Sequence, residues 1–232
     1  AYFGRSVSLY GDTALIGAKI DDSVISIVYV FTRPNADGTF TEQDTLNATD
    51  AKKNDNFGIS VSLYGDTALI GTNFDDDVGS NSGSVYVFTR PSSDGTFTQQ
   101  SKFHASDPAA EDHFGISVSL YGDTALIGAS YDDFDDGNSI KSNSGSVYVF
   151  TRSSVDGTFE RNEEQPKLNA GSDAGASDFF GHSVSLYGDT ALIGAYLDDD
   201  NQKSNSGSVY VFTRSSVDGT FTQQSKFYAS DA

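Results

Sequence analysis

Hydrophobic and polar residues alternate in short stretches along the whole chain, and the same stretches return four times. Ser-Val-Ser-Leu-Tyr occupies residues 6–10, 60–64, 117–121 and 183–187, each time followed by Gly-Asp and then Thr-Ala-Leu-Ile-Gly. Alternation over a few residues predicts a strand, and Gly-Asp between two such runs predicts a two-residue hairpin turn. Each copy therefore begins with two antiparallel strands.

Two further strands are predicted in every copy after a polar loop. The third strand, Ser-Val-Tyr-Val-Phe-Thr-Arg, occupies residues 84–90, 146–152 and 208–214, with residues 27–33 in the first copy. It is rich in the β-branched and aromatic residues that favour sheets. The fourth strand follows an Asp-Gly turn, is more polar and carries a lysine, as at Lys102 and Lys226, which is typical of an exposed edge. We therefore expect residues 6–10 and their equivalents nearest an axis and residues 40–46 and their equivalents outermost.

The second and third strands of each copy are apolar on both faces. In the second copy, for example, Val85 and Val87 point one way while Tyr86 and Phe88 point the other. A sheet with two apolar faces needs a neighbour on each side, and a β-propeller supplies these neighbours by arranging sheets as blades around an axis. The predicted fold is therefore all-β, a β-propeller with four blades of four antiparallel strands, in which Val87, Phe88, Val149, Phe150, Val211 and Phe212 are buried between blades.

The Phe-Gly pair that opens each copy sets the repeat boundaries. A single propeller domain, residues 1–232, divides into repeats 1–56, 57–113, 114–179 and 180–232. Both ends of the sequence are in register with the repeat, so we expect the four blades to close a ring through packing alone. The alternative is a segment of a longer array, such as a seven-bladed propeller.

Three motifs that recur along the chain together resemble a known family. Phe-Gly-x-Ser-Val-Ser, Ala-Leu-Ile-Gly-Ala and Gly-Ser-Val-Tyr-Val-Phe are similar to the FG-GAP repeat of integrin α-subunit propellers and related extracellular proteins. The resemblance implies one repeat per blade, an extracellular or cell-surface location, and a role in binding or cell adhesion, with no enzyme activity. The family's calcium loop, Asp-x-Asp-x-Asp-Gly between the first two strands, is reduced here to turns such as Gly65-Asp66. The family's metal ligands therefore do not carry over.

Charge and composition narrow the range of partners. The chain has 33 acidic and 14 basic residues, a formal net charge of −19, and no cysteine. This acidity argues against nucleic acid and anionic membranes as partners, and no apolar run is long enough to insert across a bilayer. Without cysteine there is neither a disulfide nor a thiolate metal site. Cations are therefore the natural partners.

Aspartates gather in the loop that follows the second strand of each repeat. Several carboxylates beside hydroxyl, amide and backbone oxygens are the ligands that calcium prefers, so we expect Ca²⁺ to bind and stabilise these loops. The competing interpretation is that Asp, Asn, Ser and Gly only form soluble turns. The candidate metal ligands are Asp21, Asp22, Asp75, Asp76, Asp77, Asp132, Asp133, Asp135, Asp136, Asp198, Asp199 and Asp200.

Three classes of function follow from these features. The favoured one is an extracellular binding, adhesion or structural assembly module with a protein or glycan partner at the cell surface. The second is a lectin with one site per blade, in which loop aromatics stack on sugar rings. An enzyme that uses the axial channel is least favoured, because copied loops suit binding better than a unique active site. The candidate sugar-stacking residues are Phe74, Tyr131, Phe134 and Tyr196, and Asn47 opens the Asn-Ala-Thr glycosylation sequon.

Overall fold

The computed structural model describes residues 2–19, 25–152, 159–161, 166–199, 204–216 and 219–230. These residues form four antiparallel sheets of four strands, which confirms the all-β fold class and the predicted strand content. The first sheet contains β1 (Tyr2–Tyr10), β2 (Thr13–Lys19), β3 (Ile27–Thr32) and β4 (Thr41–Leu46); the second contains β5 (Ser60–Tyr64), β6 (Thr67–Thr72), β7 (Ser84–Thr89) and β8 (Thr98–Phe103).

The third and fourth sheets repeat this plan with one addition. The third contains β9 (Ser117–Tyr121), β10 (Thr124–Ala129), β13 (Ser146–Thr151) and β14 (Glu160–Arg161); the fourth contains β15 (Phe180–Tyr187), β16 (Thr190–Ala195), β17 (Ser208–Thr213) and β18 (Thr222–Phe227). A small hairpin of β11 (Phe134–Asp135) and β12 (Ile140–Lys141) extends the third acidic loop, and a 3₁₀ turn spans Gly171–Asp173. No helix among the described residues is long and apolar enough to cross a membrane.

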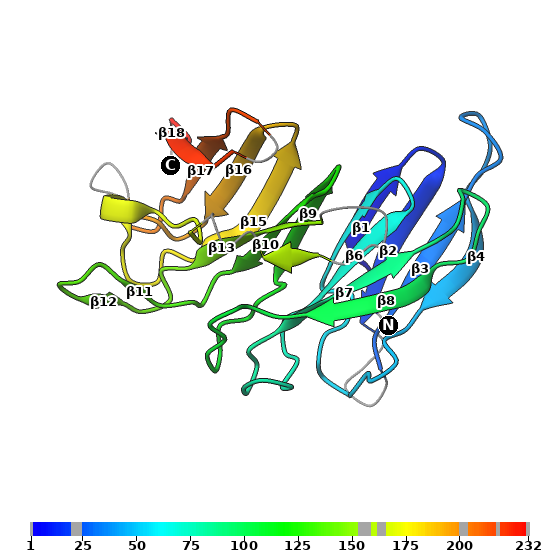
Figure 1. Cartoon of the computed structure of the whole chain (residues 1–232), viewed down its shortest axis with the longest axis horizontal. Helices are drawn as coiled ribbons and strands as arrows, with labels where there is room; N and C mark the ends of the chain where they lie inside the picture. The colour runs from blue at the N-terminus through cyan, green and yellow to red at the C-terminus, as the bar shows by residue number, and fades with distance from the viewer. Residues whose placement is uncertain are drawn as a thin grey trace.

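The sheets lie side by side in sequence order, with their first strands innermost (Figure 1). β1 contacts β5, β5 contacts β9 and β9 contacts β15, whereas the fourth strands lie at the outer edge. This order confirms the prediction that the Ser-Val-Ser-Leu-Tyr strand is nearest the axis and the polar strand outermost.

A separate hydrophobic core fills each of the three junctions between neighbouring sheets. At the second junction, Leu69, Val85 and Val87 of one sheet meet Phe114 and Ile127 of the next. Tyr86 and Phe88, on the opposite face of β7, belong instead to the first junction. The prediction of two apolar faces is therefore confirmed for the second and third sheets, because each face of these sheets supplies one side of a different core.

Close packing between neighbouring sheets requires glycine at two positions, one in the second strand and one in the Phe-Gly pair of the next sheet. A Cβ atom on Gly71 in β6 would lie 2.0 Å from the carbonyl oxygen of Gly115 in the next sheet. Gly115 itself has a φ of 86°, a conformation that other residues rarely adopt, and its carbonyl accepts a 2.8 Å hydrogen bond from the Ser60 hydroxyl. Two glycines and one serine thus set the distance between neighbouring sheets.

The four sheets form an open arc, so the expectation that they close into a ring is wrong for the described residues. The N and C termini lie toward opposite ends of the molecule (Figure 1), and no strand contact comparable to those inside the arc joins β15–β18 to β1–β4 in this part of the chain. The alternative of a longer array stays a prediction.

The arc also explains the one departure from the predicted core. Val87, Phe88, Val149, Phe150 and Phe212 are buried as expected. Val211 is only partly buried, because it faces away from the third sheet toward the open end of the arc. Its equivalents Val87 and Val149 are covered by the following sheet.

Candidate functional site

The first aspartate of each described acidic loop is buried and paired with a lysine. Asp75 is 1% exposed, and its carboxylate lies 2.7 Å from the Lys102 ammonium, which comes from β8. The hydroxyl of Tyr86 in β7 also donates to Asp75, at 3.3 Å. The same pairing, at 2.7 Å, joins Asp132 to Lys167 and Asp198 to Lys226.

The lysines keep their charge in these partly enclosed positions. Burial alone would lower the pKa of Lys102, but hydrogen bonds to Asp50, Asp75 and Asp77 outweigh it and raise the pKa above the ordinary lysine value. The pKa of Lys226 is likewise raised, because its hydrogen bonds to Asp198 and Tyr210 outweigh the effect of burial. The second, third and fourth loops therefore each have an internal cation, supplied by β8, by the segment after β14 and by β18.

The remaining aspartates of the loops are exposed, and one in each loop closes the loop itself. Asp76, Asp133 and Asp199 accept backbone N–H bonds of 2.7, 2.8 and 2.7 Å from Asn81, Asn143 and Asn205. We refer to these three residues as the outer aspartates. Asp77 pairs with Lys52 and Lys102, and Asp135 and Asp136 accept N–H bonds within the β11–β12 hairpin. Asp21, Asp22 and Asp200 lie outside the described residues.

These donor sets fit calcium poorly. Calcium takes six to eight oxygen ligands that converge on one point, and among the described residues no group of three or more acidic or histidine side chains is placed to hold a metal. The buried aspartate, which would be the deepest ligand, already contacts an ammonium. The described loops behave instead as turns in which lysine supplies the positive charge, so calcium binding stays a prediction.

A second buried aspartate in each of these sites lies two residues before the Phe-Gly pair. Asp55, Asp112 and Asp178 accept N–H bonds from the residue three positions earlier. Burial raises the pKa of all three, that of Asp112 to about 6. The sequence analysis missed this group, although Asp-x-Phe-Gly recurs in three repeats and signals it.

Three of the four candidate sugar-stacking aromatics belong to a continuous row of rings across the loop side of the arc. We define the aromatic row as Phe74, His113, Tyr131, Phe179, Tyr196 and His182. Successive ring centroids lie 4.9, 4.2, 4.8, 5.4 and 4.5 Å apart. Rings that follow a second strand, Phe74, Tyr131 and Tyr196, alternate with rings close to a Phe-Gly pair, His113, Phe179 and His182, and the row crosses two junctions. Phe134 lies apart from it, in β11.

The candidate lectin sites are therefore not four separate sites. Phe74 and Tyr131 are half-buried against His113, itself 9% exposed, whereas Tyr196, in the fourth repeat, is 47% exposed. Burial lowers the pKa of His113 and that of His182, so both rings favour the neutral form. Asn47, the sequon residue, is exposed directly after β4.

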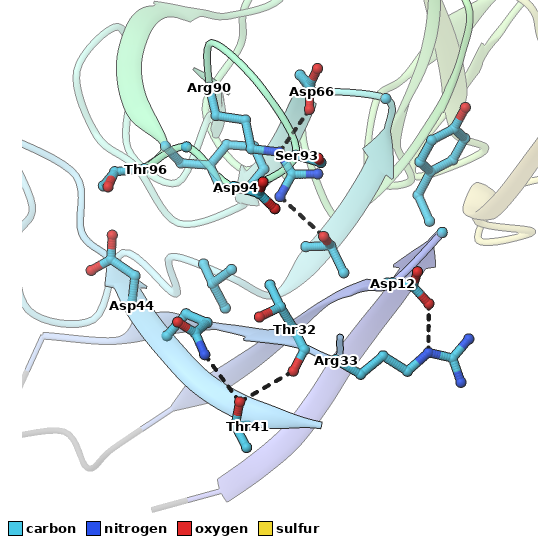
Figure 2. A pocket seen from close by; sticks show the side chains of 18 of the residues that line it. Asp12, Thr32, Arg33, Thr41, Asp44, Asp66, Arg90, Ser93, Asp94 and Thr96 are labelled. Atoms are coloured by element: carbon cyan, nitrogen blue, oxygen red, sulfur yellow. Dashed lines mark hydrogen bonds and ion pairs between the residues drawn. The ribbon is translucent and has the colours of Figure 1, made fainter. Parts of the chain in front are cut away.

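The opposite side of the arc carries a repeated ion pair and a groove. The aspartate of each Gly-Asp turn pairs with the arginine that follows the third strand, as in Arg90–Asp66 at 2.8 Å. Arg90 also reaches across to the Thr13 hydroxyl of the preceding sheet, at 3.0 Å. Between the first two sheets these groups line an open groove of about 970 Å³ (Figure 2). Both arginines in it are already paired, which leaves an excess of carboxylates.

Four stacked sheets, each apolar on both faces and joined by glycine-mediated junctions, define the chain as a β-propeller-type repeat protein. The FG-GAP repeat model matches residues 1–31, 40–88, 97–150 and 163–212. The chain therefore belongs to the FG-GAP repeat family.

Solved structures show the same fold at low sequence identity. A protein from Lactobacillus plantarum is 14% identical with a TM-score of 0.61, and the match covers 99% of this chain and 57% of that one. Sqt1 from Saccharomyces cerevisiae is 12% identical with a TM-score of 0.52, covering 98% and 48%. This chain thus spans about half the length of these neighbours. No curated protein matches the sequence.

Proposed function

We propose that this chain is a non-catalytic binding module at the cell surface or outside the cell, which engages a protein partner through its loop side. The observation that carries the proposal is the aromatic row, which runs unbroken across three sheets beside exposed carboxylates. Aromatic rings supply rigid contact area at low entropic cost. Carboxylates attract and orient a basic partner. A protein surface that combines lysine or arginine with apolar side chains fits this arrangement.

The repetition of the site and the family membership support the same proposal. The buried Asp–Lys pair occurs in each of the last three repeats, which suits a scaffold that presents several similar loops better than a unique active site. The resemblance to integrin α-subunit propellers supports an adhesive or assembly role at a cell surface. Brief protease treatment of intact cells that make the protein is expected to remove it, and complete protection would contradict a surface location.

The binding proposal is tested with labelled chain on an array of extracellular proteins. We expect binding to basic proteins that weakens with salt and is lost when the outer aspartates are replaced together by asparagine. Asparagine retains the side-chain oxygen that closes each loop, so the fold is preserved. The matched control replaces Asp37 and Asp94, exposed in turns on the opposite side. Equal binding by both variants would contradict the proposal.

A carbohydrate ligand is the second candidate, and one observation favours it. The Tyr196 ring, between Phe179 and His182 in the aromatic row, is 47% exposed and so presents aromatic surface on which a sugar ring can pack. A glycan array distinguishes the two candidates. Glycan binding that Tyr196→Ala removes, without protein binding, would replace the first proposal by the second.

Calcium stabilisation is tested separately. If the exposed loop aspartates gather around Ca²⁺ in solution, the melting temperature rises with calcium and falls with chelator, beyond the effect of sodium chloride at equal ionic strength. The Asp–Lys pairs suggest only a small effect in the second, third and fourth repeats. An unchanged melting curve together with no calcium detected by calorimetry would reject calcium as a cofactor.

A further inference from the structure

The innermost strand of every sheet ends in a tyrosine, and the four tyrosine rings form a continuous column along the inner side of the arc. We define the tyrosine column as Tyr10, Tyr64, Tyr121 and Tyr187, the last residues of β1, β5, β9 and β15. Successive ring centroids lie 5.0, 5.0 and 5.1 Å apart, and the ring planes are inclined by 51°, 53° and 61°. Each contact joins two neighbouring sheets, so the column crosses all three junctions.

The tyrosine column differs from the other tyrosines of the chain. Among the ring contacts of the described residues, only those of the column join two tyrosines. The tyrosines of the third strands, Tyr86, Tyr148 and Tyr210, are fully buried, and their hydroxyls donate to aspartates. In contrast, even Tyr64 and Tyr121, which have a sheet on either side, are partly exposed, and their hydroxyls bond to no other described residue. Their phenol protons can therefore pass directly to water.

The composition of the chain directs oxidation to tyrosine. Cysteine and methionine are side chains that oxidants attack readily, and this chain contains neither. It contains no tryptophan either, so its 12 tyrosines are the side chains that lose an electron most easily. Two tyrosyl radicals that lie side by side join through their rings. Oxidation of this chain should therefore lead to the place where tyrosine rings are neighbours.

We propose that the tyrosine column is a site of oxidative cross-linking, in which neighbouring rings join as dityrosine and tie one sheet covalently to the next. The oxidant is hydrogen peroxide acting through a haem peroxidase, which removes one electron and the phenol proton from each of two tyrosines. The two radicals form a carbon–carbon bond between ring positions next to their hydroxyls, and the hydrogen on each bonded carbon then moves to the phenol oxygen. The pair loses two hydrogen atoms in total, and one peroxide is reduced to two waters.

Such a bond acts on the junctions that hold neighbouring sheets together. With their centroids 5.0 Å apart, the rings of Tyr64 and Tyr121 need only small side-chain rotations to bring their edges together. The bond closes a long loop and so lowers the entropy of the unfolded chain, as a disulfide does. This chain has no cysteine for a disulfide. Dityrosine supplies the same kind of covalent restraint from residues that the fold already holds in contact.

Peptide mapping by mass spectrometry after oxidation tests this proposal. The full chain, at a dilution that keeps chains apart, is treated with hydrogen peroxide and a haem peroxidase, and the fraction that retains the mass of a single chain is digested. We expect dityrosine fluorescence and cross-linked peptides that pair neighbours in the column, each pair lighter by two hydrogen atoms than its two parts. Equal yields of cross-links between tyrosines outside the column, or cross-links only between chains, would overturn the proposal.

One double variant removes every tyrosine contact in the column. Tyr64→Phe combined with Tyr121→Phe retains the rings and their packing but leaves the two outer tyrosines without a tyrosine neighbour. We expect this variant to lose the intramolecular cross-link, whereas the matched control, Tyr131→Phe combined with Tyr196→Phe in the aromatic row, should cross-link as the wild type does. Circular dichroism establishes that both variants are folded. An unchanged dityrosine yield in the first variant would overturn the proposal.

Thermal melts test the restraint itself. Oxidation should raise the melting temperature of the wild-type chain and of the aromatic-row control, because the cross-link restricts their unfolded state. It should leave the melting temperature of the Tyr64→Phe, Tyr121→Phe variant unchanged. Oxidised wild-type chain that carries the cross-link and yet melts as the unoxidised chain does would show that the bond ties no sheets together, and this would overturn the proposal.

Discussion

Segments of identical sequence have different environments at the centre and at the ends of the arc. Residues 6–17, 60–71, 117–128 and 183–194 are the same twelve residues, and each contains the first hairpin of a sheet. In the two internal copies the apolar side chains are buried on both faces, whereas each terminal copy has one face open. Because the sequence is constant, neighbouring sheets alone account for the difference.

The comparison shows where the stability of this protein resides. In repeat proteins the free energy of unfolding is approximately a sum of terms within each repeat and terms between neighbours. Here the junction term includes a hydrophobic core, two close glycines, two serine bonds and one arginine bond. The ion pairs of the acidic loops belong to the term within each sheet. Substitutions at equivalent positions separate the two kinds of term.

Truncation of the buried leucine should show the largest difference. Leu126→Ala removes a side chain that is fully enclosed at the third junction, and we expect a loss of about 3 kcal/mol in the free energy of unfolding. Leu192→Ala, at the open end, should cost about 1 kcal/mol or less because much of the side chain is in water. Chemical denaturation of the two variants measures the difference. Equal losses would contradict the account.

Addition of a methyl group at the strand-two glycine should give the next largest effect. Gly128→Ala places a Cβ atom 2.0 Å from the carbonyl oxygen of Gly181, and backbone displacement of this kind costs about 2–3 kcal/mol. Gly194→Ala meets only a flexible serine side chain and should leave the melting temperature nearly unchanged. A destabilised Gly194→Ala variant would mean that the glycine serves its own sheet.

Removal of a loop lysine should, by contrast, have the same effect in an internal and a terminal sheet. Lys167→Met and Lys226→Met each leave a buried carboxylate, Asp132 or Asp198, without its cation. We expect each variant to lose about 2 kcal/mol at neutral pH, less than for a fully buried pair because the lysines are partly exposed. For Lys167→Met the loss should shrink as the pH falls, because burial raises the pKa of Asp132 and its protonation removes the unpaired charge. Thermal melts of the two variants at neutral pH would reveal any unequal losses.

The buried aspartate before Phe-Gly should give the smallest effect. Burial raises the pKa of Asp112 to about 6, above its unfolded value, so the folded state binds more protons and this residue's contribution to stability falls as the pH rises from about 4 to 6. Asp112→Asn keeps the acceptor for the Ala109 N–H and removes the penalty. The variant should therefore gain stability relative to wild type, about 1 kcal/mol or less, on going from pH 4 to pH 7. Parallel stability curves over that range would contradict the assigned pKa.

Local patterns were sufficient to predict most of the fold. Strand alternation places Val87 and Phe88 on opposite faces of their sheet. Because both faces are apolar, the sheet requires a neighbour on each side. The closure of the ring was predicted wrongly because it depends on the angle between sheets, which no single repeat reveals. Equal spacing of the repeats fits a ring and an arc alike.

The loop chemistry could be predicted only in part. Asp75 is visible in the sequence as one of several loop acids. Its partner Lys102, however, lies on a different strand, and the sequence pattern identified this lysine only as a residue of an exposed edge. Burial of the first aspartate and exposure of the next follow from the strand pairing that brings this lysine to the loop. The aromatic row depends on junctions between sheets, so the sequence identified its members without their order.

Hydrogen exchange across the four identical segments tests the central claim, that neighbouring sheets determine the stability of each repeat, most directly. Their intrinsic exchange rates are equal, and peptides extended into the flanking residues differ in mass. Residues 60–71 and 117–128 should exchange more slowly than residues 183–194, because opening an internal sheet disrupts two junctions and opening the last sheet disrupts one. Equal protection of all three segments would contradict the account.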